Sequence, residues 1–136
     1  MNNTDMEILF QKARIAAQSA YVPYSHFRVG AALLGDDGEV YTGCNVENRS
    51  FGLTICAERT AVTKAVSEGC RSFRALAIAT LDSPVPVGPC GACRQVLSEF
   101  MPANAPVRFG GQTPEQIDTT MGELIPFDSL HDLGKQ

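Results

Sequence analysis

The sequence lacks any long apolar run. No window reaches the roughly 18 uncharged apolar residues that a membrane-spanning helix needs. Its first five residues contain neither basic residues nor an apolar segment of the kind that marks a protein for export. These two absences predict that the chain is not an integral membrane protein and that it is cytoplasmic.

Basic residues are also in deficit. Eleven lysines and arginines stand against fifteen aspartates and glutamates, which gives a formal net charge of −4. Proteins that bind long nucleic acids normally present a basic surface, so nucleic acid is an unlikely partner. A small substrate with little or no charge fits this composition better.

The cysteines do not form the even set that a disulfide framework needs. There are five, and no export signal is visible, so a reduced compartment is expected. Cysteines in such a compartment usually serve as buried groups, metal ligands or nucleophiles. With 136 residues, of which 44% are apolar, the chain is expected to fold as one domain over residues 1–136 with a core of its own.

Hydrophobic periodicity and turn signals predict alternating helices and strands. Thr4-x-x-Glu7 and Thr120-x-x-Glu123 are capping-box patterns, and Gly69 is a suitable helix end. The expected helices span residues 4 to about 20, 56–68, 90 to about 101 and a short segment from 120; the expected strands span 27–34, 39–46, 73–80 and 107–109, with a further one around 117. The first two strands read as a hairpin across residues 35–38. This order predicts an α/β fold, a three-layer α/β/α sandwich with one mixed central sheet.

Three cysteines lie where helices are expected to begin. Cys90 and Cys93 share one face of a first helical turn, and Cys56 opens another helix. Helix N-termini stabilise thiolates, and thiolates bind zinc well. Three protein ligands leave the fourth tetrahedral position open, which is typical of a catalytic zinc site.

Two other interpretations of these cysteines stay open. A C-x-x-C pair is also typical of redox proteins, and a closed structural zinc site needs only one more ligand. The available candidates are Cys44, Cys70, His26 and His131, and none has ligand-like spacing. Cys44 and Cys70 are expected to be small buried or half-buried side chains.

Charged residues follow the cysteines closely. Glu58, two positions after Cys56, is expected to reach the open position of the metal and to act as a proton shuttle. A favourable charge at a helix N-terminus is the alternative role for it. Three thiolates on Zn²⁺ leave a net charge of −1, so Arg59, and with it Arg94, is a candidate donor to the sulfurs.

These motifs resemble a known family. Cys56-Ala57-Glu58 followed by Pro89-Cys90-Gly91-Ala92-Cys93 is similar to the signature of the zinc-dependent cytidine deaminases, H-x-E…P-C-x-x-C, in its three-cysteine, nucleoside-specific variant. The resemblance runs over nearly the whole chain. It extends from Tyr24-Ser25-x-Phe27 through residues 43–48 to residues 123–126.

The resemblance implies roles for further residues. Asn45 and Glu47 would bind the ribose hydroxyls, although a strand end followed by a turn is their simpler explanation. Phe27, otherwise an ordinary core residue, would pack on the pyrimidine. Main-chain groups near Ala57 and Pro89 would bind the base edge. The implied reaction is hydrolysis of cytidine or 2′-deoxycytidine to the uracil nucleoside and ammonia, in pyrimidine salvage, with one Zn²⁺ per chain.

The resemblance also implies a homotetramer with shared active sites. Phe127 is the candidate aromatic for a subunit contact, and Phe51 occupies a position where relatives often have tyrosine. Three alternatives to cytidine deamination remain. They are deamination of a blasticidin-like nucleoside, deamination of cytosine within RNA, and a non-catalytic zinc module.

Overall fold

A computed structural model describes residues 1–130 and 133. It contains one five-stranded mixed sheet with the strand order β2-β1-β3-β4-β5. The elements are α1 (Asn3–Ala17), β1 (Val29–Gly35), β2 (Val40–Cys44), the 3₁₀ helix η1 (Phe51–Leu53), α2 (Ala57–Ser67), β3 (Phe73–Thr80), α3 (Gly91–Ser98), β4 (Pro106–Gly110), β5 (Gln116–Thr120) and α4 (Met121–Leu124). Strands β3 and β4 are parallel, and the other neighbouring strands are antiparallel.

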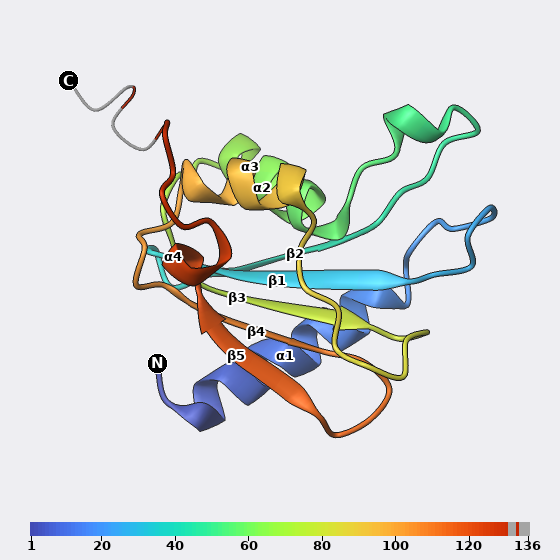
Figure 1. Ribbon diagram of the computed structural model, residues 1–136, viewed down its shortest axis with the longest axis horizontal. Coiled ribbons are helices and arrows are strands. Elements are labelled where there is room, and N and C mark those ends of the chain that lie inside the picture. The colour runs from blue at the N-terminus through green and yellow to red at the C-terminus, as the bar shows by residue number, and fades with distance from the viewer. Residues whose placement is uncertain (131–132, 134–136) are drawn as a thin grey trace.

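Helices cover both faces of this sheet (Figure 1). Alternate residues of a strand point to opposite faces. Leu33, Leu76 and Ile78 pack on one face with residues of α2 and α3. On the other face, smaller residues such as Ala32 and Ala77 pack against α1. The predicted α/β sandwich with one mixed sheet is confirmed.

Two glycines let helices approach the sheet closely. A Cβ atom at Gly30 would lie 2.0 Å from the carbonyl oxygen of Ala13 in α1. A Cβ atom at Gly43 would lie 2.5 Å from the amide nitrogen of Ala61 and 2.6 Å from the carbonyl oxygen of Ala57, both in α2. Gly43 therefore fixes how near the first turn of α2 comes to β2.

Several local predictions are confirmed. The hairpin pairs β1 with β2 across residues 35–38, and Gly38 has a φ of 84°. Gly69 follows α2 with a φ of 100°, as expected of a helix end. The strand expected around Ile117 is β5. Thr120 caps α4, with its side chain accepting a hydrogen bond from the amide of Glu123.

Other boundaries were predicted wrongly. The N-cap of α1 is Asn2 and not Thr4, because the Asn2 side chain accepts the amide hydrogen bond of Asp5 and brings Thr4 into the first turn. Helix α1 ends at Ala17, before the expected position, and α3 ends at Ser98. The loop expected over residues 47–54 contains η1.

The described residues contain no helix that is both long enough and apolar enough to span a membrane. His131, one of the candidate fourth ligands, lies outside the described residues. The expectation of one domain over residues 1–136 stays a prediction.

Candidate metal centre and catalytic pocket

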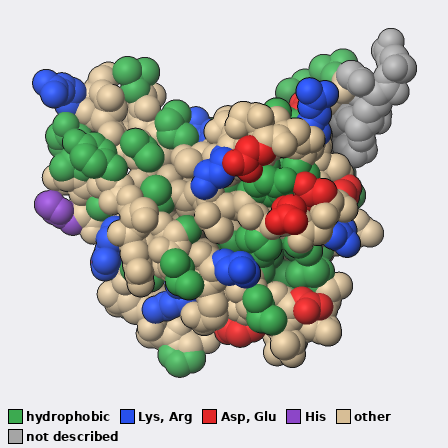
Figure 2. Space-filling model, turned by 180° about the vertical axis from the view of Figure 1, so that it is seen from behind, with side chains coloured by type: hydrophobic (Ala, Val, Ile, Leu, Met, Phe, Trp, Pro, Cys, Tyr) green, Lys and Arg blue, Asp and Glu red, His purple; other side chains and the backbone are tan. Residues whose placement is uncertain are grey.

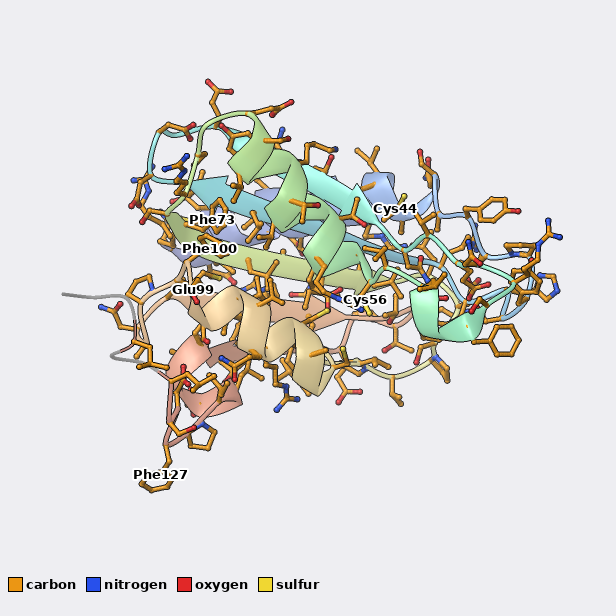
Figure 3. The ribbon with its side chains drawn as sticks, turned by 90° about the horizontal axis from the view of Figure 1, so that it is seen from above. Cys44, Cys56, Phe73, Glu99, Phe100 and Phe127 are labelled. Carbon is orange, nitrogen blue, oxygen red and sulfur yellow. The ribbon has the colours of Figure 1, made fainter. Side chains whose placement is uncertain are left out.

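Two helix N-termini meet above the sheet. Cys56 is the N-cap of α2 and Cys90 is the N-cap of α3, and both have extended backbone angles that end the preceding loop. Their sulfur atoms lie 3.9 Å apart. Figure 3 shows Cys56 at the start of α2, beside the start of α3. Unpaired N–H groups and the positive ends of two helix dipoles therefore converge on one point, where they favour negative charge.

The third sulfur joins this point from the first turn of α3. The ligand atoms of Cys56, Cys90 and Cys93 all lie within 4.8 Å of one another. Among residues 1–130 and 133, no fourth histidine, cysteine or carboxylate belongs to this cluster. Cys44 is half-buried and Cys70 is buried, both outside the cluster, as expected for non-ligand cysteines. The three cysteines that the sequence analysis brought together thus lie in one three-sulfur cluster.

The surroundings of Cys56 stabilise its thiolate. The adjacent Cys93 thiol and the guanidinium of Arg59, which donates a hydrogen bond from Nη2 at 3.4 Å, lower the pKa of Cys56. The neighbouring Cys56 sulfur raises the pKa of Cys93, as does the burial of Cys93. Sulfurs this close together suit a divalent cation, which binds thiolates and displaces the protons of the thiols.

Arg94 does not contact a sulfur, so that part of the prediction was wrong. Its Nε donates to the carbonyl oxygen of Pro89 at 2.8 Å, and its Nη1 donates to that of Leu124 at 3.0 Å. The two carbonyls satisfy its guanidinium and draw it toward α4. Arg94 therefore holds the residue before Cys90 in place instead of donating to the thiolates.

Glu58 lies in the first turn of α2 and is only 3% exposed. Its Oε1 is buried with no hydrogen-bond partner within the described part of the chain. Burial raises the pKa of this carboxyl group. An unpaired buried carboxylate oxygen is costly, and its usual explanation is a ligand, ion or water that completes it.

A pocket of about 170 Å³ opens beside the three sulfurs. Glu58, Phe27, Asn45 and Ala57 line it, together with Cys56 and Cys90. Its walls are mostly apolar, with a few polar groups near the cysteines. A concave apolar pocket with a few convergent polar groups is typical of a small-molecule site.

The two predicted ribose-binding residues differ in position. The Asn45 side chain lines the pocket and makes two hydrogen bonds to main-chain groups of Phe27 and Val29. Glu47 is not among the lining residues. Its carboxylate accepts hydrogen bonds from the amides of Tyr24 and Ser25, both at 3.1 Å, and from the Ser25 hydroxyl. These bonds lower the pKa of Glu47.

The remaining predicted aromatics lie outside the pocket. Phe51, in η1, makes an edge contact with Tyr24, with ring centroids 5.7 Å apart. Phe127 is fully exposed, has a φ of 55°, and points away from the body of the molecule (Figure 3).

Six residues that line the pocket were not predicted from the sequence. These are Val29, Thr54, Ile78, Thr80, Val87 and Gly88. Thr80 ends β3 beside the parallel strand β4, and ligands in α/β proteins often bind at the carboxyl ends of such strands. That general rule is a signal that could have found Thr80.

Residues 3–108 match the family described as "Cytidine and deoxycytidylate deaminase zinc-binding region". The chain is 51% identical over 122 residues to a cytidine deaminase from Sporosarcina psychrophila, which covers 90% of this chain and 89% of that protein. It is similar to a crystal structure of cytidine deaminase from Burkholderia pseudomallei, with a TM-score of 0.85, 42% identity and coverage of 93% and 98%. A Mycobacterium tuberculosis cytidine deaminase structure gives a TM-score of 0.78 and 45% identity over 90% of this chain and 94% of that one.

The three-sulfur cluster fits the metal in the family description, since zinc takes thiolate ligands in tetrahedral sites. The protein binds one zinc ion per chain, and the cluster of Cys56, Cys90 and Cys93 is the group of residues that would hold it. The chain thus belongs to the cytidine and deoxycytidylate deaminase family that is defined by this zinc-binding region.

Proposed function

We propose that this protein hydrolyses cytidine and 2′-deoxycytidine to uridine and 2′-deoxyuridine, with release of ammonia. The observation that carries the proposal is the buried Glu58 side chain, whose Oε1 has no hydrogen-bond partner among the described residues, in the same pocket as the three-sulfur cluster. The similar proteins named above are cytidine deaminases. They favour this reaction over a blasticidin-like substrate or a non-catalytic zinc module.

The reaction adds water across the C4–N3 bond of the base and then breaks the C4–N4 bond. Zinc, when bound, lowers the pKa of water and so supplies a nucleophile at neutral pH. Glu58 accepts the proton of the attacking water and delivers it to N3. It then moves a second proton to the departing amino group. Ammonia leaves, and C4 keeps the oxygen as the carbonyl of uracil.

The pocket supports a bound nucleoside. Phe27 would pack on the pyrimidine ring, and main-chain groups near Ala57 and Pro89 would bind the base edge. Asn45 retains a free N–H and a free lone pair for a ribose hydroxyl after its two internal bonds. Glu47 would bind ribose by exchanging a hydrogen bond from the turn at Ser25 for one from the sugar.

The test is the loss of cytidine absorbance as zinc is titrated into metal-free protein. Turnover should rise in proportion to bound zinc and stop rising at one ion per chain. A panel of cytidine, 2′-deoxycytidine, cytosine, a blasticidin-like nucleoside and an RNA oligomer should be processed mainly through the first two. Zinc binding without loss of cytidine absorbance would favour the non-catalytic module.

We further propose that the protein is a homotetramer with shared active sites, and that it serves pyrimidine salvage in the cytoplasm. Exposed apolar side chains support the assembly. Phe51 is 73% exposed, Leu53 is 64% exposed and Phe127 is fully exposed. Figure 2 shows hydrophobic side chains gathered on a projecting corner of the surface. Apolar surface of this kind is typical of protein–protein contacts.

A further inference from the structure

One wall of the pocket is held along both edges by side chains. Phe27 and Val29 line this wall. On the side of β2, the Asn45 amide donates to the carbonyl oxygen of Phe27 at 2.8 Å and accepts from the amide of Val29 at 2.9 Å. On the side of β3, the amide of Arg28 donates to the Asp82 carboxylate at 2.8 Å. The wall is thus fixed by one side chain on each edge.

Asp82 continues the pairing of β1 and β3 where the main chain leaves the sheet. The last main-chain bond of this pair runs from the amide of Leu81 to the carbonyl oxygen of Arg28, at 3.1 Å. After it, the chain enters a segment with prolines at positions 84, 86 and 89, which cannot donate to a strand ladder. The Asp82 carboxylate supplies the acceptor that a further strand residue would have given.

The Arg28 side chain fixes this carboxylate. Its Nη2 donates to Oδ1 of Asp82 at 2.8 Å, and its Nε donates to Oδ2 at 3.0 Å. Such two-point pairing of a guanidinium with a carboxylate defines the orientation of both groups. Arg28 lies between Phe27 and Val29, which both line the pocket, but its own side chain contacts Asp82 and is absent from the pocket lining.

The same aspartate begins the segment that forms another part of the pocket. Residues 81–89 carry Val87 and Gly88, both of which line the pocket, and lead to Cys90. Farther along, the carbonyl oxygen of Ser83 accepts a hydrogen bond from the amide of Gln112 at 2.8 Å. Asp82 therefore joins the Phe27 wall to the segment that carries Val87.

We propose that Arg28 and Asp82 are positioning residues that set the spacing between these two walls and so determine how tightly the pyrimidine is held. Neither side chain touches the substrate. The pair acts through the main chain of residues 27–29 and through the start of residues 81–89. This inference rests on the proposed function, because it assigns the wall to base binding.

The test compares D82N, D82A and R28M with the wild type in steady-state assays on cytidine and 2′-deoxycytidine. The KM should rise about tenfold in D82A, which loses charge-assisted bonds, while kcat stays within about a factor of two. The KM should rise most in D82A, less in D82N and least in R28M, because the bond from the Arg28 amide survives in R28M. Both substrates should be affected by the same factor, since the wall faces the base and not the sugar.

D36N is the matched control. Asp36 pairs with Arg74 at 3.5 Å on the surface, and neither residue lines the pocket. The D36N substitution should therefore leave the KM unchanged. Hydrogen exchange at the Arg28 and Val29 amides gives a second readout that needs no activity, and it should be at least about tenfold faster in D82A than in D36N.

The two proposals fail in different ways. A wild-type protein that does not convert cytidine contradicts the proposed function, and hydrogen exchange then decides the role of the pair. If the wild type is active and D82A has the same KM, the positioning role is wrong, even where D82A has lost thermal stability. Unchanged exchange at Arg28 and Val29 also overturns it.

Discussion

Arg59 and Cys56 are one helical turn apart at the start of α2, and Nη2 of Arg59 lies 3.4 Å from the Cys56 sulfur. Three thiolates around Zn²⁺ carry a net charge of −1, which weakens the pull of the ion on a bound water. The Arg59 charge opposes that excess. Loss of a group that donates a hydrogen bond to a metal ligand typically lowers metal affinity or activity by about 10- to 100-fold.

Replacing Arg59 with Gln should therefore weaken zinc binding by about 10- to 100-fold. The side chain keeps part of its length but loses the positive charge next to the sulfur. Competition with a zinc-chelating dye measures the change. Lys64→Gln, on the exposed face of the same helix, removes an equal charge away from the cluster and should bind zinc like the wild type. Equal zinc affinity in the two variants would contradict the role given to Arg59.

Glu58→Gln should nearly abolish turnover while zinc content and cytidine binding persist. Gln keeps the shape of the side chain but cannot accept and return a proton, and a positioned acid–base group is worth about 10²- to 10⁴-fold in rate. Steady-state kinetics, zinc content per chain and equilibrium binding of cytidine check the three parts. Glu68→Gln, at the exposed end of α2, is the control and should retain full activity. A kcat close to that of the wild type in E58Q would refute the proton shuttle.

Local signals were enough to predict that the three cysteines lie at helix starts. Cys90 and Cys93 share a turn because of their spacing, and Cys56 opens a helix because a loop precedes it. The hairpin of β1 and β2 and the apolar strand β3 were likewise readable, since their patterns are local. These predictions succeeded because a few consecutive residues determine the geometry, although the N-cap of α1, expected at Thr4, is Asn2.

Contacts between distant residues could not be predicted in this way. Arg59 and Arg94 follow their cysteines at similar spacing, yet only Arg59 meets a sulfur, because carbonyl groups of Pro89 and Leu124 bind Arg94. The bonds of Glu47 to the turn at Ser25 also join segments more than 20 residues apart. Nothing in the local sequence distinguishes such partners, since the fold brings them together.

Gly43→Ala should destabilise the protein by at least about 2 kcal/mol and lower its zinc content. The added methyl group would overlap main-chain atoms of Ala57 and Ala61, so α2 would have to move off the sheet, and overpacking of this kind typically costs about 1–3 kcal/mol or more. Thermal unfolding and zinc analysis measure both effects. Gly52→Ala is the control, because a Cβ atom there would meet no atom within 4 Å. Equal stability of the two variants would show that α2 does not depend on the close approach.

Phe127→Ala should weaken the assembly without destabilising the subunit. The side chain is fully exposed in the single chain, so its removal costs no packing there. Sedimentation at falling protein concentration should show smaller species for F127A at concentrations where the wild type remains tetrameric. Ile15→Ala, which trims a residue that is 65% exposed on α1, should leave the assembly unchanged. An unaltered mass distribution for F127A would remove Phe127 from the subunit contact.

The pairing of Asp82 with Arg28 predicts a pH dependence of stability. Its hydrogen bonds and the Arg28 charge lower the pKa of Asp82 from 3.8 to about 2. A carboxyl group whose pKa is depressed by folding stabilises the protein fully above its unfolded pKa, and this contribution disappears as the pH falls through the folded pKa. The stability difference between wild type and D82N should thus be constant above about pH 5 and shrink between pH 3.8 and about 2. Its size should stay below about 1 kcal/mol, because Arg28 is 43% exposed and Asp82 26%. Urea unfolding of both proteins in the metal-free state tests this, and a difference that grows toward low pH would contradict the ionised pair.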